Sequence, residues 1–173
     1  QVSVEQALAV RAALHRQSDG SHHISASLLV FGLGNDAPMW HNMTTGRVAF
    51  IEDDAEWVER ARAGAAYLEA HVVRYAEGVV ATAKVLFSAA RRSSWPRLDL
   101  SPQLPPSVRE QRWDVVVVDA PKAGAQKNPG RQQSIYTAAR LVRPGTGAIF
   151  VDDCERENER FFAAAFLGER VGR

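Results

Sequence analysis

Residues 113–120 of this chain are WDVVVVDA. Within them an unbroken run of four β-branched valines is followed by an acid, Asp119. A strand with one solvated face alternates apolar and polar residues, whereas a strand covered on both faces is apolar along its whole length. Strands of the second kind occur in parallel sheets with helices on both sides, because every parallel connection needs a crossover. The run therefore predicts a central strand of an α/β domain.

Shorter apolar runs flank this stretch and alternate with segments of helical periodicity. The apolar runs are SLLVFG (27–32), RVAFIE (47–52), HVVRY (71–75) and GAIFVDD (147–153). The helical segments are residues 54–70, 78–92, 130–142 and 157–167. Strands that alternate with helices indicate βαβ units, so we predict a Rossmann-like, doubly wound, mostly parallel sheet. The proline-rich residues 93–110 are expected to form an ordered surface loop beside the acceptor cleft.

A further helix is predicted over residues 3–16, before the first strand. Ser3 can cap this helix, and Gln6 can close a capping box with it. The apolar positions of the helix are Val4, Leu8, Val10 and Leu14. A length of 173 residues fits one domain. We expect an N-terminal helix and loop over residues 1–26 and an α/β core over residues 27–173.

Composition excludes several classes of partner. The formal net charge is +1, too close to neutral to favour nucleic acid or a membrane surface. No apolar run approaches the length of about 18 residues that a membrane span requires. Cys154 is the single cysteine, so no disulfide can form within the chain. We therefore expect no nucleic-acid partner and no membrane contact from this segment.

A glycine-containing loop, GLGNDA (32–37), follows the first predicted strand. Glycines allow the backbone to approach a nucleotide closely and to adopt positive φ angles. Glu52 ends the second strand, 20 residues after Gly32, where an acid can accept both hydroxyls of a ribose. Together they predict a nucleoside site that includes Gly32, Gly34, Glu52 and Asp53. The alternative is a tight strand-to-helix turn without a ligand.

The type of nucleoside follows from size and charge. The loop fits the dinucleotide fingerprint G-x-G-x-x-A, but a dehydrogenase needs a further substrate domain that 173 residues cannot hold. Asp36, at the start of the next helix, would repel a pyrophosphate. S-adenosylmethionine carries a sulfonium and no phosphate, so acids around its site are tolerated. These features favour a methyltransferase.

Acids also end the later strands. Asp119 follows the valine run and precedes Lys122, while Asp152 and Asp153 end the last apolar run. Converging carboxylates repel one another unless they share a proton or a cation. An Asp/Lys set could deprotonate a hydroxyl, and a divalent cation could do so by lowering the hydroxyl pKa. The alternative is that these aspartates cap the helices that follow, with Asp153 capping the last one.

Cations cluster after the valine run, where an acceptor would enter. Lys122, Lys127 and Arg131 lie within ten residues of one another. An arginine can bind a carboxylate through two parallel hydrogen bonds. The cluster predicts an acceptor that carries a carboxylate, and the alternative is a loop whose cations only increase solubility.

Three blocks resemble a known family: residues 28–60, 113–140 and 149–167. They are similar to the plant polysaccharide-biosynthesis domain family, whose members include glucuronoxylan 4-O-methyltransferases. The resemblance runs from about Ser3 to Leu167. It implies a class I methyltransferase fold and methyl transfer from S-adenosylmethionine to glucuronic acid side chains of a cell-wall polysaccharide. It also implies a location in the Golgi lumen.

The resemblance assigns expected roles to individual positions. Expected at the cofactor are Phe31, Gly32, Gly34, Glu52, Asp53 and Asp119. Expected in catalysis are Asp119, Lys122 and Asp153, with a divalent cation as an option. Expected at the acceptor are Trp40, Lys122 and Arg131. Further matching positions are Pro121, Pro129, Gly130 and Arg156.

The chain also departs from the family. Many relatives have His-Asp in place of Asp152-Asp153, and relatives continue past Arg173 into further strands, so the sheet is expected to be short of its last strands. Two other functions stay open. One is a non-catalytic scaffold of polysaccharide synthesis, and the other is a metal-dependent methyltransferase of small phenols.

Overall fold

The computed structural model describes residues 2–18, 23–76, 95–121 and 130–168. Five parallel strands form one sheet in the order β3-β2-β1-β4-β5. The strands are β1 (Leu28–Phe31), β2 (Val48–Glu52), β3 (Glu69–Val72), β4 (Val115–Val118) and β5 (Ala148–Val151). The chain winds outward from β1 to β3 and then returns to β4 on the other side of β1. This arrangement confirms the predicted doubly wound parallel sheet.

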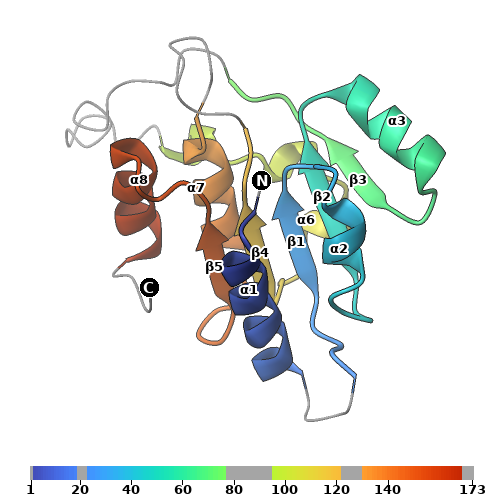
Figure 1. The fold of residues 1–173 in the computed structure, drawn as a ribbon. Coiled ribbons are helices and arrows are strands. Elements are labelled where there is room, and N and C mark those ends of the chain that lie inside the picture. The colour runs from blue at the N-terminus through green and yellow to red at the C-terminus, as the bar shows by residue number, and fades with distance from the viewer. Residues whose placement is uncertain (1, 19–22, 77–94, 122–129, 169–173) are drawn as a thin grey trace.

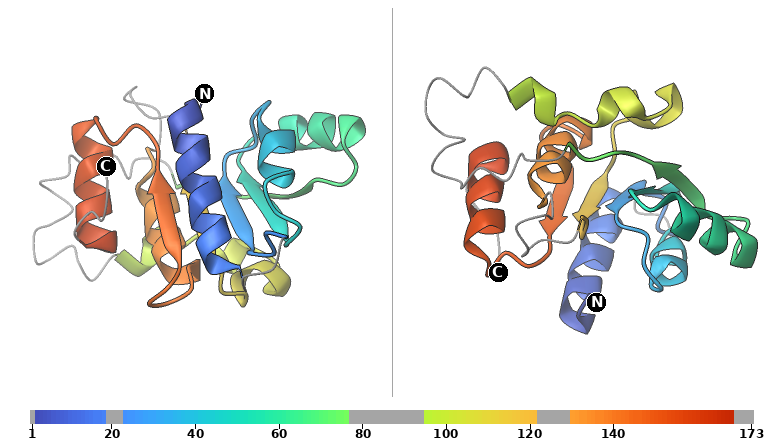
Figure 2. Two further views of the ribbon diagram at one scale, coloured as in Figure 1. Left: turned by 60° about the horizontal axis from the view of Figure 1, so that its bottom comes forward. Right: turned by 90° about the horizontal axis from the view of Figure 1, so that it is seen from above.

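Helices cover both faces of the sheet (Figures 1 and 2). One face carries α1 (Val4–Gln17), α2 (Ala37–His41) and α3 (Ala55–Gly64). The other carries α7 (Gln132–Leu141) and α8 (Glu157–Leu167), which pack against each other. Two 3-10 turns, η1 (Trp95–Leu98) and η2 (Ser101–Gln103), and the short helix α6 (Pro106–Arg109) lie on this second face.

Strand β4 is the centre of the domain. It pairs with β1 on one side and β5 on the other, and all four of its valines are buried. Val115 and Val117 pack in the core beneath α1, while Val116 and Val118 pack in the core beneath α7. The valine run is therefore buried on both faces, as its sequence predicts.

Helix α1 has the predicted capping box but not the predicted apolar face. Val10, Ala13 and Leu14 are buried, whereas Val4 and Leu8 are 77% and 58% exposed. The reason is that only the second half of the helix packs on the sheet, through residues spaced three and four apart. These three buried side chains belong to the core on the first face of the sheet.

The proline-rich segment also differs from its prediction as a surface loop. Its turns bury Leu98, Leu100, Leu104 and Val108, and the last three pack in the core on the second face of the sheet. The prolines of this segment predicted a loop, so the pattern did not reveal these side chains as core. None of these four side chains lines the cavity at the carboxyl ends of β1, β2 and β4. The helix predicted over residues 78–92 lies outside the described residues.

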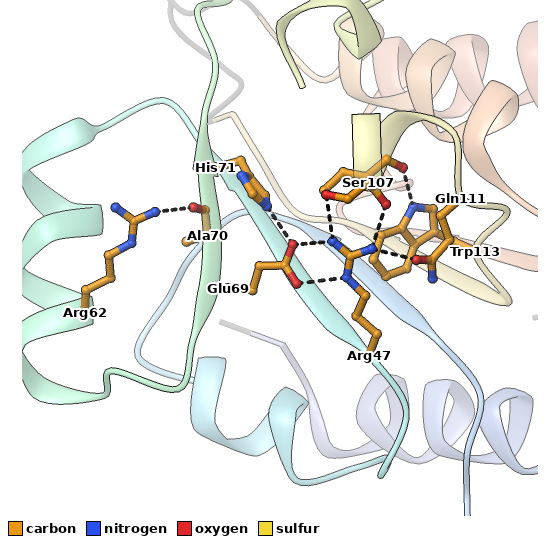
Figure 3. A network of polar contacts seen from close by, with 9 residues as sticks. Arg47, Arg62, Glu69, Ala70, His71, Ser107, Gln111 and Trp113 are labelled. Carbon is orange, nitrogen blue, oxygen red and sulfur yellow. Dashed lines mark hydrogen bonds and ion pairs between the residues drawn. The ribbon is translucent and has the colours of Figure 1, made fainter. Parts of the chain in front are cut away.

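A polar network joins this segment to the amino ends of β2 and β3 (Figure 3). Arg47 donates from Nε and Nη2 to the two carboxylate oxygens of Glu69, at 2.9 and 2.5 Å. Its Nη1 donates to the carbonyl of Ser107 at 2.6 Å and to Gln111 at 2.8 Å. The guanidinium also lies 5.4 Å from the ring centre of Trp113. We call these residues the Arg47 network.

Candidate cofactor-binding and catalytic site

A cavity of about 450 Å³ opens at the carboxyl ends of β1, β2 and β4. It lies where the strand order reverses, which is where doubly wound sheets bind ligands. Its volume is in the range of small-molecule sites. It is lined by Val30, Gly32, Leu33, Gly34, Asp36, Trp40, Glu52, Asp53, Asp54, Asp119, Ala120 and Pro121. Sequence reasoning therefore found both glycines, Trp40 and three of the acids.

The two glycines of the loop have different roles. Gly32 has a φ of 114°, and a Cβ added there would lie 3.2 Å from the Cβ of Ala120. The position thus needs glycine both for its backbone angle and for the close approach of the segment after β4. Gly34 has no positive φ, and its added Cβ would meet only the side chain of Asp36. The predicted conformational reason holds for Gly32 alone.

Glu52 lines the cavity and also holds its walls together. Its Oε2 accepts a hydrogen bond from the backbone N–H of Leu33 at 2.8 Å. Its Oε1 accepts from the N–H groups of Asp53 and Asp54 at 2.9 and 3.1 Å. A carboxylate offers about four lone-pair sites, so one remains for a ligand once Asp53, which also bonds to Glu52 when protonated, is ionised. Glu52 can therefore accept one ribose hydroxyl without releasing the loop, rather than both.

The other two acids after β2 are distinct from Glu52. Asp54 is the N-cap of α3 and accepts from the N–H of Trp57 at 2.9 Å. Burial, together with a hydrogen bond to Glu52 and its charge, raises the pKa of Asp53 to about 6. Asp53 is consequently the member of this run that changes charge near neutral pH.

A second acid cluster surrounds Arg131, the N-cap residue of α7. The Nη2 atom of Arg131 lies 2.9 Å from Asp119, 2.7 Å from Asp153 and 3.7 Å from Asp152. The side chain is only 4% exposed, and within the described part of the chain its Nε and Nη1 atoms have no hydrogen-bond acceptor. The expectation of an arginine free at the cleft rim to bind an acceptor carboxylate is therefore wrong. Arg131 instead supplies the cation that lets these acids converge.

The pKa values of Asp119 and Asp152 are shifted in opposite directions. Burial and the bond with Asp152 raise the pKa of Asp119 to about 6, although the charge of Arg131 acts in the opposite direction. Burial would raise the pKa of Asp152 as well, but bonds with Asp119 and Gln6 outweigh it and lower this pKa. The proton consequently resides on Asp119, which is the carboxyl that lines the cavity.

Asp153 takes part in the cluster without lining the cavity. It has a φ of 58° and pairs with Arg156 as well as Arg131, at 2.7 Å in both cases. The N-cap of α8 is Arg156. The alternative that Asp153 caps the last helix is therefore wrong.

The remaining predicted residues have mixed outcomes. Trp40 is 2% exposed and belongs to the core, so it offers the cavity no more than an edge. Phe31 has no exposed surface, packs in the core of the opposite face and does not line the cavity, which argues against a cofactor contact by its side chain. Lys122, Lys127 and Pro129 lie outside the described residues.

Two residues near the site were missed by sequence reasoning. Gln6 donates from Nε2 to Asp152 Oδ1 at 2.6 Å, a contact that no sequence spacing predicts across 146 positions. Tyr75 is buried, which raises the pKa of its hydroxyl, and it bonds to Ser134 at 3.0 Å. Its only signal was its position at the end of an apolar run.

The described part of the chain contains neither a metal-ligand cluster nor a membrane-spanning helix. Residues 2–18, 23–76, 95–121 and 130–168 hold no group of three or more His, Cys, Asp or Glu side chains that could bind a metal ion. The expected option of a divalent cation thus has no support there. None of the described helices is long and apolar enough to cross a membrane.

Three curated proteins of Arabidopsis thaliana are similar to this chain. Glucuronoxylan 4-O-methyltransferase 1 is 35% identical in an alignment of 158 positions that covers 83% of this chain and 55% of the relative. Arabinogalactan O-methyltransferase 1 is 34% identical in an alignment of 159 positions that covers 82% of this chain and 55% of the relative. Protein IRX15-LIKE is 30% identical in an alignment of 199 positions, gaps included, that covers 92% of this chain and 62% of the relative. The chain therefore spans little more than half the length of these relatives.

A solved structure and a family model complete the comparison. The crystal structure of Streptomyces venezuelae DesVI matches with a TM-score of 0.51 over 86% of this chain and 49% of DesVI. The identity is 14%, so the likeness concerns the fold alone. The model of the family described as IRX15/IRX15L/GXM matches residues 20–172. The fold and the relatives agree with the resemblance found in the sequence, and the chain belongs to the IRX15/IRX15L/GXM family.

Proposed function

We propose that this chain belongs to an S-adenosylmethionine-dependent O-methyltransferase that modifies glucuronic acid side chains of a cell-wall polysaccharide such as glucuronoxylan. The observation that carries the proposal is the position of Asp119 on the cavity wall, together with Gly32 and Gly34 of the glycine loop and with Arg131 at 2.9 Å. It gives a carboxyl with a pKa of about 6 on the wall of the cavity. A group of that pKa can accept a proton from a hydroxyl near neutral pH.

The residues around the cavity fit this cofactor. Gly32 leaves free the space beside Ala120 that a side chain would take. Among the residues that the structure describes, the ionisable side chains that line the cavity are all acids: Asp36, Glu52, Asp53, Asp54 and Asp119. Such a wall repels phosphates, whereas it suits a sulfonium and the hydroxyls of a ribose. A dinucleotide or a nucleoside triphosphate, each of which carries phosphates, therefore fits this acidic wall poorly.

Each residue of the site has a separate role in the proposed methyl transfer. The bound donor supplies a methyl group, which moves to the acceptor oxygen as the carbon–sulfur bond breaks and its electrons remain on sulfur. Asp119 accepts the proton that leaves the acceptor hydroxyl. Before that step Arg131 offsets the negative charges of Asp119, Asp152 and Asp153. Glu52 orients the donor through one ribose hydroxyl. Holding the acceptor oxygen in line with the methyl group can lower the barrier by several kcal/mol.

The acceptor part of the proposal rests on the names of the relatives and on two lysines. Glucuronoxylan 4-O-methyltransferase 1 and Arabinogalactan O-methyltransferase 1 are named for polysaccharides. Because Arg131 is already paired with acids, Lys122 and Lys127 are the cations we propose for the uronic carboxylate. We place the reaction in the Golgi lumen, on the family resemblance alone.

A transfer assay with two polymers tests the proposal. Native glucuronoxylan is compared with the same polymer whose uronic carboxyls have been reduced to alcohols, using S-adenosylmethionine labelled in its methyl group. We expect kcat/KM on the reduced polymer to be about 30- to 1000-fold lower. Equal transfer to both polymers would contradict the uronic acid. An absence of transfer, with no binding of S-adenosylhomocysteine in calorimetry, would favour the scaffold function.

A further inference from the structure

We propose that Gln6, in the first turn of α1, is a positioning residue for the acid pair Asp119–Asp152. Its side-chain amide holds Asp152 as the ionised partner, so that a proton taken from the acceptor stays on Asp119. The inference rests on the proposed function, since it assigns Asp119 as the proton acceptor. The contact that carries it is the hydrogen bond from Gln6 Nε2 to Asp152 Oδ1, at 2.6 Å.

The orientation of the Gln6 amide is fixed by the start of the helix. The backbone N–H of Ser3 donates to Gln6 Oε1 at 2.7 Å, and the N–H of Gln6 donates to Ser3 Oγ at 3.2 Å. A flipped amide would set its NH₂ group against the N–H of Ser3, which is a contact between two donors. The capping box therefore directs the NH₂ group to Asp152 and makes Gln6 a donor to this carboxylate.

The charges around Asp152 show why this donor matters. Its Oδ1 accepts from Gln6, and its Oδ2 lies 3.7 Å from Arg131, which is closer to Asp119 and Asp153. Arg156 is paired with Asp153 at 2.7 Å. Arg131 is thus shared by three acids. Gln6, in α1, provides Asp152 with a further hydrogen-bond donor. Its bond is one of the causes that lower the pKa of Asp152 while that of Asp119 is raised.

The same helix contains a matched control. Gln17, at the other end of α1, donates from Nε2 to the carbonyl of Thr146, just before β5. Gln6 binds Asp152, just after β5, so α1 is tied to both flanks of this strand, beside which it lies in Figure 2. Both ties use a glutamine amide, but only the tie of Gln6 reaches an acid of the cluster.

The test is an NMR titration of the aspartate carboxyl carbons in the protein without donor. In Gln6→Ala the lower transition of the Asp119–Asp152 pair, that of Asp152, is expected to move up by about one pH unit, since a hydrogen bond to its charged form is lost. In Gln17→Ala it is expected to stay in place. The carboxyl carbon of Asp119, which titrates in the upper step of the wild type, should then divide its change between both steps in Gln6→Ala, while the KM for S-adenosylmethionine stays unchanged.

A second variant separates positioning from helix capping. Gln6→Glu keeps the acceptor for the N–H of Ser3, because Glu also closes a capping box, but it replaces the donor with an acid. We expect helix content to be retained and the lower transition to move by more than in Gln6→Ala. Titration of either Gln6 variant like the wild type, or an equal shift in Gln17→Ala, would overturn the proposal. The expected shifts in a protein that transfers no methyl group would support the positioning of Asp152 and reject the proposed function.

Discussion

Each end of the sheet contains an arginine surrounded by polar groups, and the two arrangements differ in charge balance. At the amino end Arg47 meets one carboxylate with two nitrogens and gives its third nitrogen to neutral acceptors (Figure 3). Its bonds lower the pKa of Glu69. At the carboxyl end Arg131 meets three carboxylates with a single nitrogen. There the pKa of Asp119 is raised to about 6.

Strand β4 repeats this contrast within six residues. Asp114 precedes the strand and accepts hydrogen bonds from the backbone and hydroxyl of Ser27, both at 2.8 Å, while Arg143 lies 2.7 Å away. Burial would raise the pKa of Asp114, but these bonds outweigh it and lower the pKa. Asp119 follows the strand and has the opposite shift. The amino end thus stabilises the fold, whereas the carboxyl end retains unbalanced acids, as functional sites do.

The largest expected effect concerns turnover at the carboxyl end. Asp119→Asn should lower kcat by about 100-fold or more, because the proton acceptor is lost, while binding of S-adenosylhomocysteine persists. Asp114→Asn is the matched control at the other end of β4, and its turnover per folded molecule should equal that of the wild type. Steady-state kinetics and calorimetry measure both. Similar turnover in the two variants would remove Asp119 from catalysis.

The next effect concerns stability at the amino end. Arg47→Ala removes the bonds to Glu69, Ser107 and Gln111 and the stacking on Trp113. We expect it to lower the free energy of unfolding by about 2 kcal/mol, since the pair is partly exposed. Chemical denaturation measures this value. A loss of donor affinity at unchanged stability would show that the two ends are not functionally separate.

The fold could be predicted where local patterns carry the information. The valine run, the alternation of strands with helices and the Ser3–Gln6 cap are all local, and each was confirmed. The core side chains of residues 98–108 could not be placed, because the prolines of this segment predicted a surface loop.

The acids of the candidate site could be predicted from the sequence, whereas the side chains that bind these acids could not. Strand ends that meet at one edge of a parallel sheet identified Asp119, Asp153 and Glu52. The burial of Arg131 depends on three carboxylates from two strand ends, which no spacing in the sequence displays. Charged side chains are mostly exposed, so an arginine in a loop was expected at the surface. The contact of Gln6 with Asp152 is equally hidden from the sequence.

The smallest expected effect is the change of stability with pH, and it tests the charge imbalance around Asp119 most directly. Because Asp119 has a raised pKa in the folded state, the folded protein binds more protons than the unfolded chain between about pH 4 and pH 6. Its contribution to stability therefore falls as the pH rises through this window.

The decisive measurement is the free energy of unfolding of the wild type and Asp119→Asn at pH 4, 6 and 8. Removing the charge should make the variant more stable than the wild type at pH 8, relative to pH 4, by about 1 kcal/mol after allowance for solvent screening. Asp114→Asn should instead be less stable than the wild type at pH 8. A loss of stability at pH 8 in Asp119→Asn, as large as that in Asp114→Asn, would contradict the account, because Asp119 would then stabilise the fold as the acids of the amino end do.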